Sequence, residues 1–204
     1  AIFKDIPNPL FPRLGGPTMN QVPTGITVGP DGALYVGTLT GFPFPQGGAK
    51  VYRVEDKNGD GDALDEGEVT VYATGLSTVT DVAFDRDGSL LVTQFSLDML
   101  TQAPGNIVRV KGGEISEVAA PLVSPTSLTV LGDGQVLVSM EFLGIVAEAK
   151  TAAAIVKSAG GPPPRGETPA PPGPLPQPRT GAAGLVRQSA SVSMLLVAAL
   201  AVIA

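Results

Sequence analysis

The sequence predicts an all-β protein, and three observations support this. The chain has 204 residues with 26 Gly and 20 Pro, and aromatic residues make up only 5% of it, which favours turns and short strands over long helices. Short apolar runs with alternating polar residues flank Asp-Gly pairs, the pattern of two strands joined by a tight turn. This unit occurs three times along the chain.

The repeated unit predicts a β-hairpin. Its copies span residues 23–36, 79–92 and 125–138. We assign a structural role to the turn residues Asp31, Asp87 and Asp133, because an Asp-Gly pair supplies the backbone geometry that the turn requires.

The spacing of the copies predicts a β-propeller. The turn aspartates are 56 and 46 residues apart, close to the roughly 40–50 residues of a four-stranded blade. The intervals hold two more strands each: third strands at 49–54 and 106–110, fourth strands at 69–74 and 114–118. We therefore predict a partial β-propeller over residues 21–145, about three blades of a six-bladed type. The blades span about 23–74, 76–118 and 122–145.

The flanking segments are assigned separately. Residues 1–20 are a lead-in, and the Ala-rich segment 146–159 lacks the Gly-Gly turn of the earlier copies, so we expect a helix or irregular chain there. Residues 160–180 hold nine prolines and predict an extended linker in a disordered tail.

Residues 181–204 form a C-terminal segment with a short apolar tail. The last 11 residues are apolar, too few to span a membrane. Small residues, a spacer and this tail fit a glycolipid-anchor signal; the alternatives are a fortuitous apolar end and a poorly anchored helix. We expect an extracellular, cell-surface or periplasmic protein, and we expect the chain to be a fragment of a longer propeller or a truncated gene product, since it begins without Met or an export signal.

Composition excludes several kinds of chemistry. The chain has no Cys and no His, so thiolate nucleophiles, disulfides, imidazole-ligated zinc and His-dependent triads are absent. The net charge of −6 divides into an excess of nine acidic groups over residues 1–150 and an excess of three basic groups over residues 151–204. An acidic body argues against nucleic acid and favours a cation as partner.

An acidic segment at residues 55–68 predicts calcium binding. It holds seven carboxylates and one lysine, with oxygen-bearing side chains at alternate positions around a glycine, as in calcium loops. Position 12 of an EF-hand loop is Gly67 here, so the segment is not an EF-hand. The alternative is a solvated acidic loop. The candidate ligands are Asp56, Asn58, Asp60, Asp62, Asp65 and Glu66.

The inner strands supply a second candidate site. The first strand of a blade lines the channel, so Gly25, Asp81 and Ser127, at equivalent positions, are expected at one mouth of it. Thr38, Gln94 and Met140 follow the second strands and form the neighbouring ring. From these two rings we select four candidate ligand-binding residues: Asp81, Ser127, Thr38 and Gln94. Asp81 is the only carboxylate among them. It is a candidate ligand or general base, and the alternative is a structural turn or cap residue.

Residues 22–45, followed by 49–54, resemble the ScyD/ScyE family, the Thr40–Pro45 stretch most specifically. The resemblance continues through 71–76 and the second copy and covers about residues 20–140. It implies a six-bladed propeller similar to NHL-repeat and TolB-like proteins. Members of the family are expected to be exported and are associated by name with scytonemin clusters. The family has no established activity, so the resemblance assigns no catalytic residue. The chain departs from the family at Thr38, where an acidic residue is expected, in the acidic segment, and in having fewer blades.

Two functions remain open. The first is a non-catalytic, calcium-stabilised binding or scaffold propeller that takes an unknown protein or small molecule on one face, with membrane attachment through a lipid anchor. The second is a calcium-dependent propeller hydrolase of the lactonase or gluconolactonase type. If the chain is complete, a homodimer of two three-bladed chains would close a six-bladed ring and bury the open faces.

Overall fold

The computed structural model describes residues 3–141 and 144–150, all within the first of two compact units, Ala1–Pro164. Thirteen β-strands in four antiparallel sheets make up nearly all of the regular structure of this part of the chain, which confirms the all-β prediction. Ala149 and Lys150, at the end of the described residues, have helical backbone. No helix in the described residues is long and apolar enough to cross a membrane. The Pro-rich linker, the C-terminal segment and residues 151–159 of the Ala-rich segment lie outside the described residues.

Two of the sheets are four-stranded meanders. The first sheet has the order β3 (Gln21–Val28), β4 (Leu34–Thr40), β5 (Ala49–Val54) and β6 (Val69–Leu76). The middle sheet has the order β7 (Val79–Phe84), β8 (Leu90–Gln94), β9 (Gly105–Lys111) and β10 (Glu114–Leu122). Each strand pairs antiparallel with the next, as the sequence predicts.

The other two sheets are smaller. The third sheet has the order β11 (Pro125–Val130), β12 (Val136–Met140) and β13 (Ile145–Glu148). A two-stranded sheet, β1 (Ile6–Pro7) with β2 (Thr18–Met19), precedes the first copy of the repeat.

Each Asp-Gly turn has the backbone that the sequence predicts. Gly32, Gly88 and Gly134 have φ values of 82°, 74° and 90°. This left-handed region is readily available only to glycine. The hairpins also share one register, because Ile26 pairs with Val36, Val82 with Val92, and Leu128 with Val138.

The expectation of a helix or irregular chain is wrong for residues 146–148. They belong to β13, which pairs with β12, Val146 opposite Ser139 and Glu148 opposite Leu137. The turn before β13 uses a single glycine, Gly144, with φ of 58°, in place of a Gly-Gly pair. The β-branched Ile145 and Val146 favour a strand, and the free edge of β12 supplies its partner.

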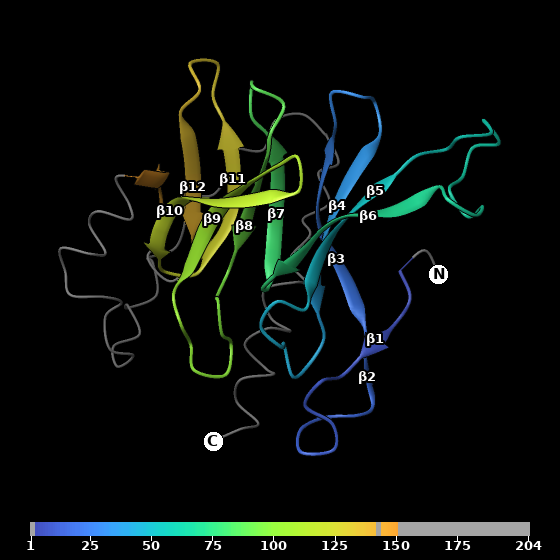
Figure 1. The fold of residues 1–204 in the computed structure, drawn as a ribbon. Helices are drawn as coiled ribbons and strands as arrows, with labels where there is room; N and C mark the ends of the chain where they lie inside the picture. Colours follow the sequence, from blue (N-terminus) through green and yellow to red (C-terminus); the bar gives the residue numbers. More distant parts are fainter. Residues whose placement is uncertain (1–2, 142–143, 151–204) are drawn as a thin grey trace, which may run out of the picture. The chain divides into compact units, whose positions relative to one another are not determined.

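The three larger sheets pack face to face in chain order (Figure 1). Strand β7 contacts β3 and β4 on one side and β11 on the other. Alternation along β8 separates two cores: Leu90 and Val92 are buried against the first sheet, whereas Leu91 is buried against the third. Consecutive antiparallel meanders with adjacent inner strands define the blades of a β-propeller, here an incomplete one.

Candidate functional site

The structure brings Gly25, Asp81 and Ser127 together. A Cβ atom on Gly25 would lie 2.6 Å from the Asp81 Cα. The Asp81 Oδ2 accepts hydrogen bonds from the Ser127 Oγ at 2.6 Å and from the Leu128 N–H at 2.9 Å, and its Oδ1 accepts from the Val82 N–H at 2.9 Å. The Asp81 carboxylate therefore links the inner strands of the middle and third sheets.

Thr38 and Gln94 lie apart from that link. The Thr38 Oγ1 donates to the Lys50 carbonyl at 3.0 Å, within the first sheet. The Gln94 amide donates to the Asn106 Oδ1 at 2.7 Å within the middle sheet and accepts from the Ser77 N–H in the connection from β6 to β7. Both side chains are buried and stabilise their own blade, so ligand binding by them stays a prediction.

Met140, the third member of the second predicted ring, is buried in the core between the middle and third sheets. Asp81 and Ser127 are thus the two selected residues that the structure places together near the inner strands.

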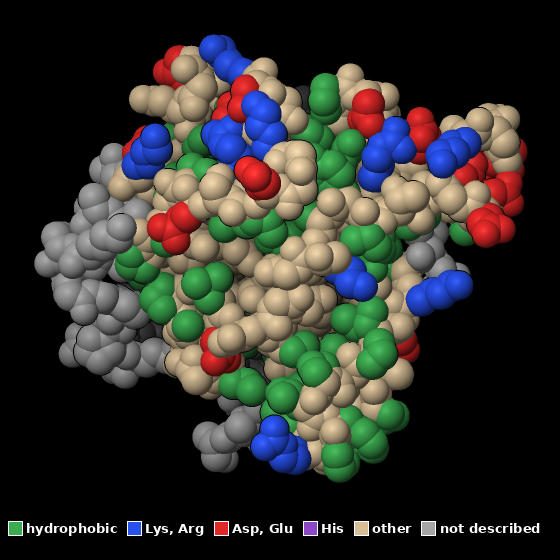
Figure 2. Space-filling model, in the orientation of Figure 1, with side chains coloured by type: hydrophobic (Ala, Val, Ile, Leu, Met, Phe, Trp, Pro, Cys, Tyr) green, Lys and Arg blue, Asp and Glu red, His purple; other side chains and the backbone are tan. Residues whose placement is uncertain are grey.

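The acidic loop between β5 and β6 projects from the first sheet, and acidic side chains gather on it at the right edge of Figure 2. Its side chains mostly cap the loop backbone. The Asp56 carboxylate accepts from the Gly59 and Gly61 N–H groups at 2.6 and 2.9 Å, and the Asn58 amide donates to the Asp65 Oδ2 at 2.5 Å. These backbone donors, Gly61 first and then Gly59, hold the Asp56 pKa below its usual value.

The Asn58 amide also donates to the Asp60 Oδ2 at 3.1 Å, so it joins Asp60 and Asp65. Asp60 and Asp62 each accept a backbone N–H two residues further along the loop. Within residues 3–141 and 144–150, no group of three or more Asp or Glu side chains is arranged to hold a metal ion. Calcium binding by this loop therefore stays a prediction from the sequence.

The sequence offers Glu68, with Asp65 and Glu66, as a closing calcium ligand, but it does not predict the position that Glu68 takes. It lies at the base of the acidic loop with only 2% of its surface exposed. Its two carboxylate oxygens accept from the Lys57 and Asp65 N–H groups at 2.9 and 3.0 Å. It therefore fastens the two ends of the loop together.

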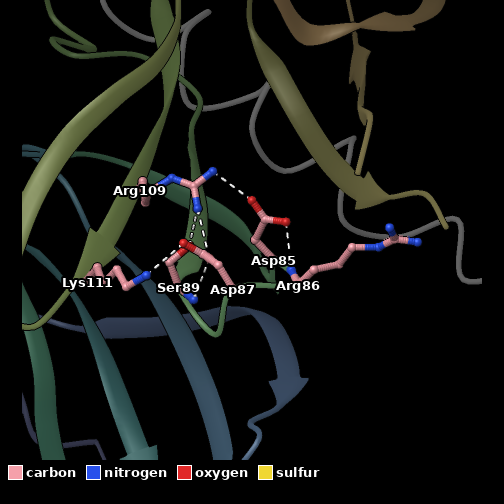
Figure 3. A network of polar contacts seen from close by, with 6 residues as sticks. All are labelled: Asp85, Arg86, Asp87, Ser89, Arg109 and Lys111. Atoms are coloured by element: carbon pink, nitrogen blue, oxygen red, sulfur yellow. Dashed lines mark hydrogen bonds and ion pairs between the residues drawn. The ribbon is translucent and has the colours of Figure 1, made fainter. Parts of the chain in front are cut away.

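Arginines at the Asp-Gly turns were also missed. The Arg53 Nε donates to the Asp31 Oδ2 at 2.7 Å in the first sheet. Figure 3 shows the equivalent cluster in the middle sheet, where Arg109 reaches Asp85 at 2.7 Å and Asp87 at 3.0 Å, and Lys111 reaches Asp87 at 2.8 Å.

These ion pairs shift the pKa values of the turn aspartates. The Arg53 guanidinium lowers the pKa of Asp31, and Lys111, followed by Ser89, lowers the pKa of Asp87. Both carboxylates therefore stay ionised in the folded protein under mildly acidic conditions. They can then keep their ion pairs, which join the turn to the third strand of each sheet.

A hollow of about 260 Å³ lies beside the middle-sheet cluster, between the middle and third sheets. Asp85 and Arg109 line one side of it. Asp133, Gln135 and the end of β13 line the other. Its charged and amide groups suit a small polar ligand better than an apolar one.

The chain matches no family model and no curated protein. Among solved structures, it is similar to virginiamycin B lyase from Staphylococcus aureus, with 19% identity, 62% of this chain and 40% of that chain covered, and a TM-score of 0.41. It is also similar to a protein of unknown function from Bacteroides caccae, with 17% identity, 64% and 42% covered, and a TM-score of 0.43. A streptogramin B lyase has 17% identity, 63% and 54% covered, and a TM-score of 0.33.

The chain spans about two fifths of the first two proteins, and TM-scores this low assign no activity. The class of protein therefore follows from the strand topology, which is that of a β-propeller with three blades in the described residues.

Proposed function

We propose that this chain is a non-catalytic, extracytoplasmic binding or scaffold propeller of the ScyD/ScyE type. One observation carries the proposal: both oxygens of Asp81 are engaged by groups of the middle and third sheets. A general base must offer an oxygen to the proton that it removes. Hydrogen bonds from two sheets support a structural role for Asp81, which is the only carboxylate in the two predicted channel rings.

The hollow between the middle and third sheets is the binding site that this proposal favours. It presents Arg109 and Asp85 at its wall, so it offers both donors and acceptors to a small polar molecule or to a polar side chain of a partner. The Arg109 guanidinium is held in place by Asp85 and Asp87, so binding a ligand would cost little side-chain entropy at this residue.

A lactone-hydrolysis assay tests the absence of catalysis. We expect no calcium-dependent turnover above background from the wild-type chain or from an Asp81→Ala variant. Turnover that needs calcium and disappears in a folded Asp81→Ala variant would contradict the proposal. Ser127→Ala is the matched control, because it removes one hydrogen bond to Asp81 and leaves the carboxylate in place.

Calcium stabilisation stays a prediction from the sequence. Calorimetric titration with calcium chloride, together with thermal unfolding, tests it on the wild-type chain and on an Asp60→Asn/Asp62→Asn variant. The prediction expects heat of binding and a higher melting temperature for the wild type alone. A flat titration would refute calcium binding and would leave the proposed binding role untouched.

A further inference from the structure

Three loops at one end of the sheets expose large apolar side chains. They connect β1 to β2, β4 to β5 and β8 to β9, and they span residues 8–17, 41–48 and 95–104. We call the surface that these loops form the loop end; it lies at the lower edge of Figure 1, opposite the Asp-Gly turns. Its exposed apolar side chains are Phe11, Phe42, Leu97 and Leu100, which are 52%, 40%, 39% and 48% exposed.

The three loops belong to one surface. A Cβ atom on Gly15 would lie 3.5 Å from the side chains of Phe42 and Pro43, so the first loop packs against the second. The Gln46 side chain of the second loop donates a hydrogen bond to the Asp98 carboxylate of the third. The exposed apolar side chains are therefore presented together.

Hydrogen bonds fix the first and third loops. The Asn8 amide donates to the carbonyls of Leu14 and Gly16, both at 2.7 Å. The Ala103 N–H donates to the Asp98 carbonyl at 3.0 Å. The fold thus holds these apolar side chains in contact with water, and covering them would cost little loop entropy.

The two ends of the sheets differ in charge. The three loops of the loop end hold one arginine and one aspartate in 28 residues, whereas four loops at the opposite end hold eleven carboxylates and two basic side chains. Figure 2 shows the same division, with charged side chains gathered along the upper edge and green apolar ones frequent along the lower edge. The four loops of the opposite end are residues 29–33, 55–68, 85–89 and 131–135.

The exposed charge of the loop end is positive. Arg13 is exposed and lies two residues after the exposed Phe11. Asp98 is half-buried, and its carboxylate accepts the Leu100 N–H at 2.9 Å. The loop end therefore offers apolar side chains beside a guanidinium.

This combination matches an anionic lipid bilayer. Phe and Leu side chains enter the boundary between headgroups and acyl chains, and basic side chains are attracted to anionic headgroups. The carboxylates of the opposite end lie about 20 Å away, because strand β4, which joins the two ends, has seven residues. This distance exceeds the Debye length of about 8 Å at physiological salt, so the bilayer would repel those carboxylates only weakly.

We propose that the loop end binds the surface of an anionic lipid bilayer, with Phe11, Phe42, Leu97 and Leu100 entering it and Arg13 at the level of the headgroups. The hollow between the middle and third sheets lies at the opposite end, beside Asp85 and Asp133, and would face the aqueous phase. Bilayer and hollow could thus be occupied together, and failure of the lipid contact would leave the proposed binding role untouched.

Co-sedimentation of the full chain with vesicles tests the proposal. The vesicles are phosphatidylcholine with roughly one third anionic phosphatidylglycerol. We expect the wild type to bind them and Arg13→Ala to bind about fivefold more weakly. Phe11→Glu and Leu100→Glu should each bind at least about tenfold more weakly, because a charge replaces an apolar side chain that enters the bilayer. Leu64→Glu adds the same charge on a leucine that is 69% exposed in the acidic loop, so this matched control should bind as the wild type does.

A single tryptophan reports which end meets the bilayer. The chain has no Trp, so Phe11→Trp and Leu64→Trp each add one. On addition of vesicles, the emission of the Phe11→Trp variant should shift to shorter wavelength, as expected for an indole that leaves water, and the emission of the Leu64→Trp variant should stay unchanged. Unfolding midpoints close to wild type confirm that the substitutions leave the fold intact.

Three results would overturn the proposal. The first is a wild type that does not bind the anionic vesicles. The second is equal binding of the wild type, Phe11→Glu and Leu100→Glu, which would assign the contact to another part of the chain, such as the apolar residues 194–204. The third is an unchanged emission of the Phe11→Trp variant.

Discussion

The close approach of the first and middle sheets at Gly25 predicts that Gly25→Ala destabilises the fold. An added Cβ would lie 2.6 Å from the Asp81 Cα and 2.8 Å from the Val82 N, distances that real Cβ atoms do not adopt. These are backbone atoms of the inner strand β7, and Asp81 is also held by Ser127 and Leu128. The sheets must therefore separate to admit the methyl group.

Overpacking of this kind costs about 1–3 kcal/mol. For a chain of this size, that corresponds to a melting temperature lower by roughly 2–12 °C. Urea unfolding followed by circular dichroism measures the difference. Gly16→Ala is the matched control, because its Cβ would meet nothing closer than 3.9 Å. A Gly25→Ala variant within about 0.5 kcal/mol of wild type would refute the close approach of the two inner strands.

Three further predictions concern single side chains. Leu90→Ala should cost about 2–5 kcal/mol in urea unfolding, because Leu90 is fully buried between the first and middle sheets, and a loss below about 1 kcal/mol would contradict that packing. Lys111 lowers the pKa of Asp87, so this carboxylate stabilises the fold above its usual pKa and loses that effect as the pH falls through the lowered value. Asp87→Asn should therefore flatten the acid side of the profile of melting temperature against pH. An unchanged profile would exclude this contribution. Glu68→Gln should lower the free energy of unfolding by about 1–3 kcal/mol, because an amide nitrogen cannot accept the hydrogen bond that a carboxylate oxygen accepts. Glu66→Gln, on an exposed residue, should be neutral. Equal effects of the two substitutions would contradict the buried position of Glu68.

The hairpins were predictable because their determinants are local. An Asp-Gly pair between two alternating apolar strands specifies turn and register within about 14 residues, and Gly32, Gly88 and Gly134 have the positive φ that this requires. Strand β13 was not predictable in this way. Its pairing partner β12 supplies the hydrogen bonds, and the strand preference of Ile145 and Val146 covers only two residues at the start of an Ala-rich segment.

The sequence carries a signal for the ion pairs between Arg53 and Asp31 and between Arg109 and Asp87. Arg53 lies 22 residues after Asp31, and Arg109 lies 22 residues after Asp87. An equal spacing of opposite charges in two copies of a repeat indicates a contact within each copy. The third sheet has Glu148 at the position equivalent to these arginines, so this ion pair does not extend to it.

The role of Asp81 depends on a distant partner and has no local signal. Its partners Ser127 and Leu128 are 46 and 47 residues away, and they approach only after the middle and third sheets have packed. From the sequence alone, a carboxylate on an inner strand is as compatible with chemistry as with structure. The packed sheets provide the hydrogen bonds that favour structure.

Hydrogen exchange at the Leu128 amide tests most directly whether Asp81 joins the sheets or serves chemistry. This N–H donates to the Asp81 Oδ2 at 2.9 Å, so it should be protected in the wild type and exchange at least about tenfold faster in Asp81→Ala, which corresponds to about 1.4 kcal/mol. The Val138 amide, on the neighbouring strand β12, serves as the internal reference. Equal Leu128 exchange rates in the two proteins would show that Asp81 does not hold this contact and would contradict the account.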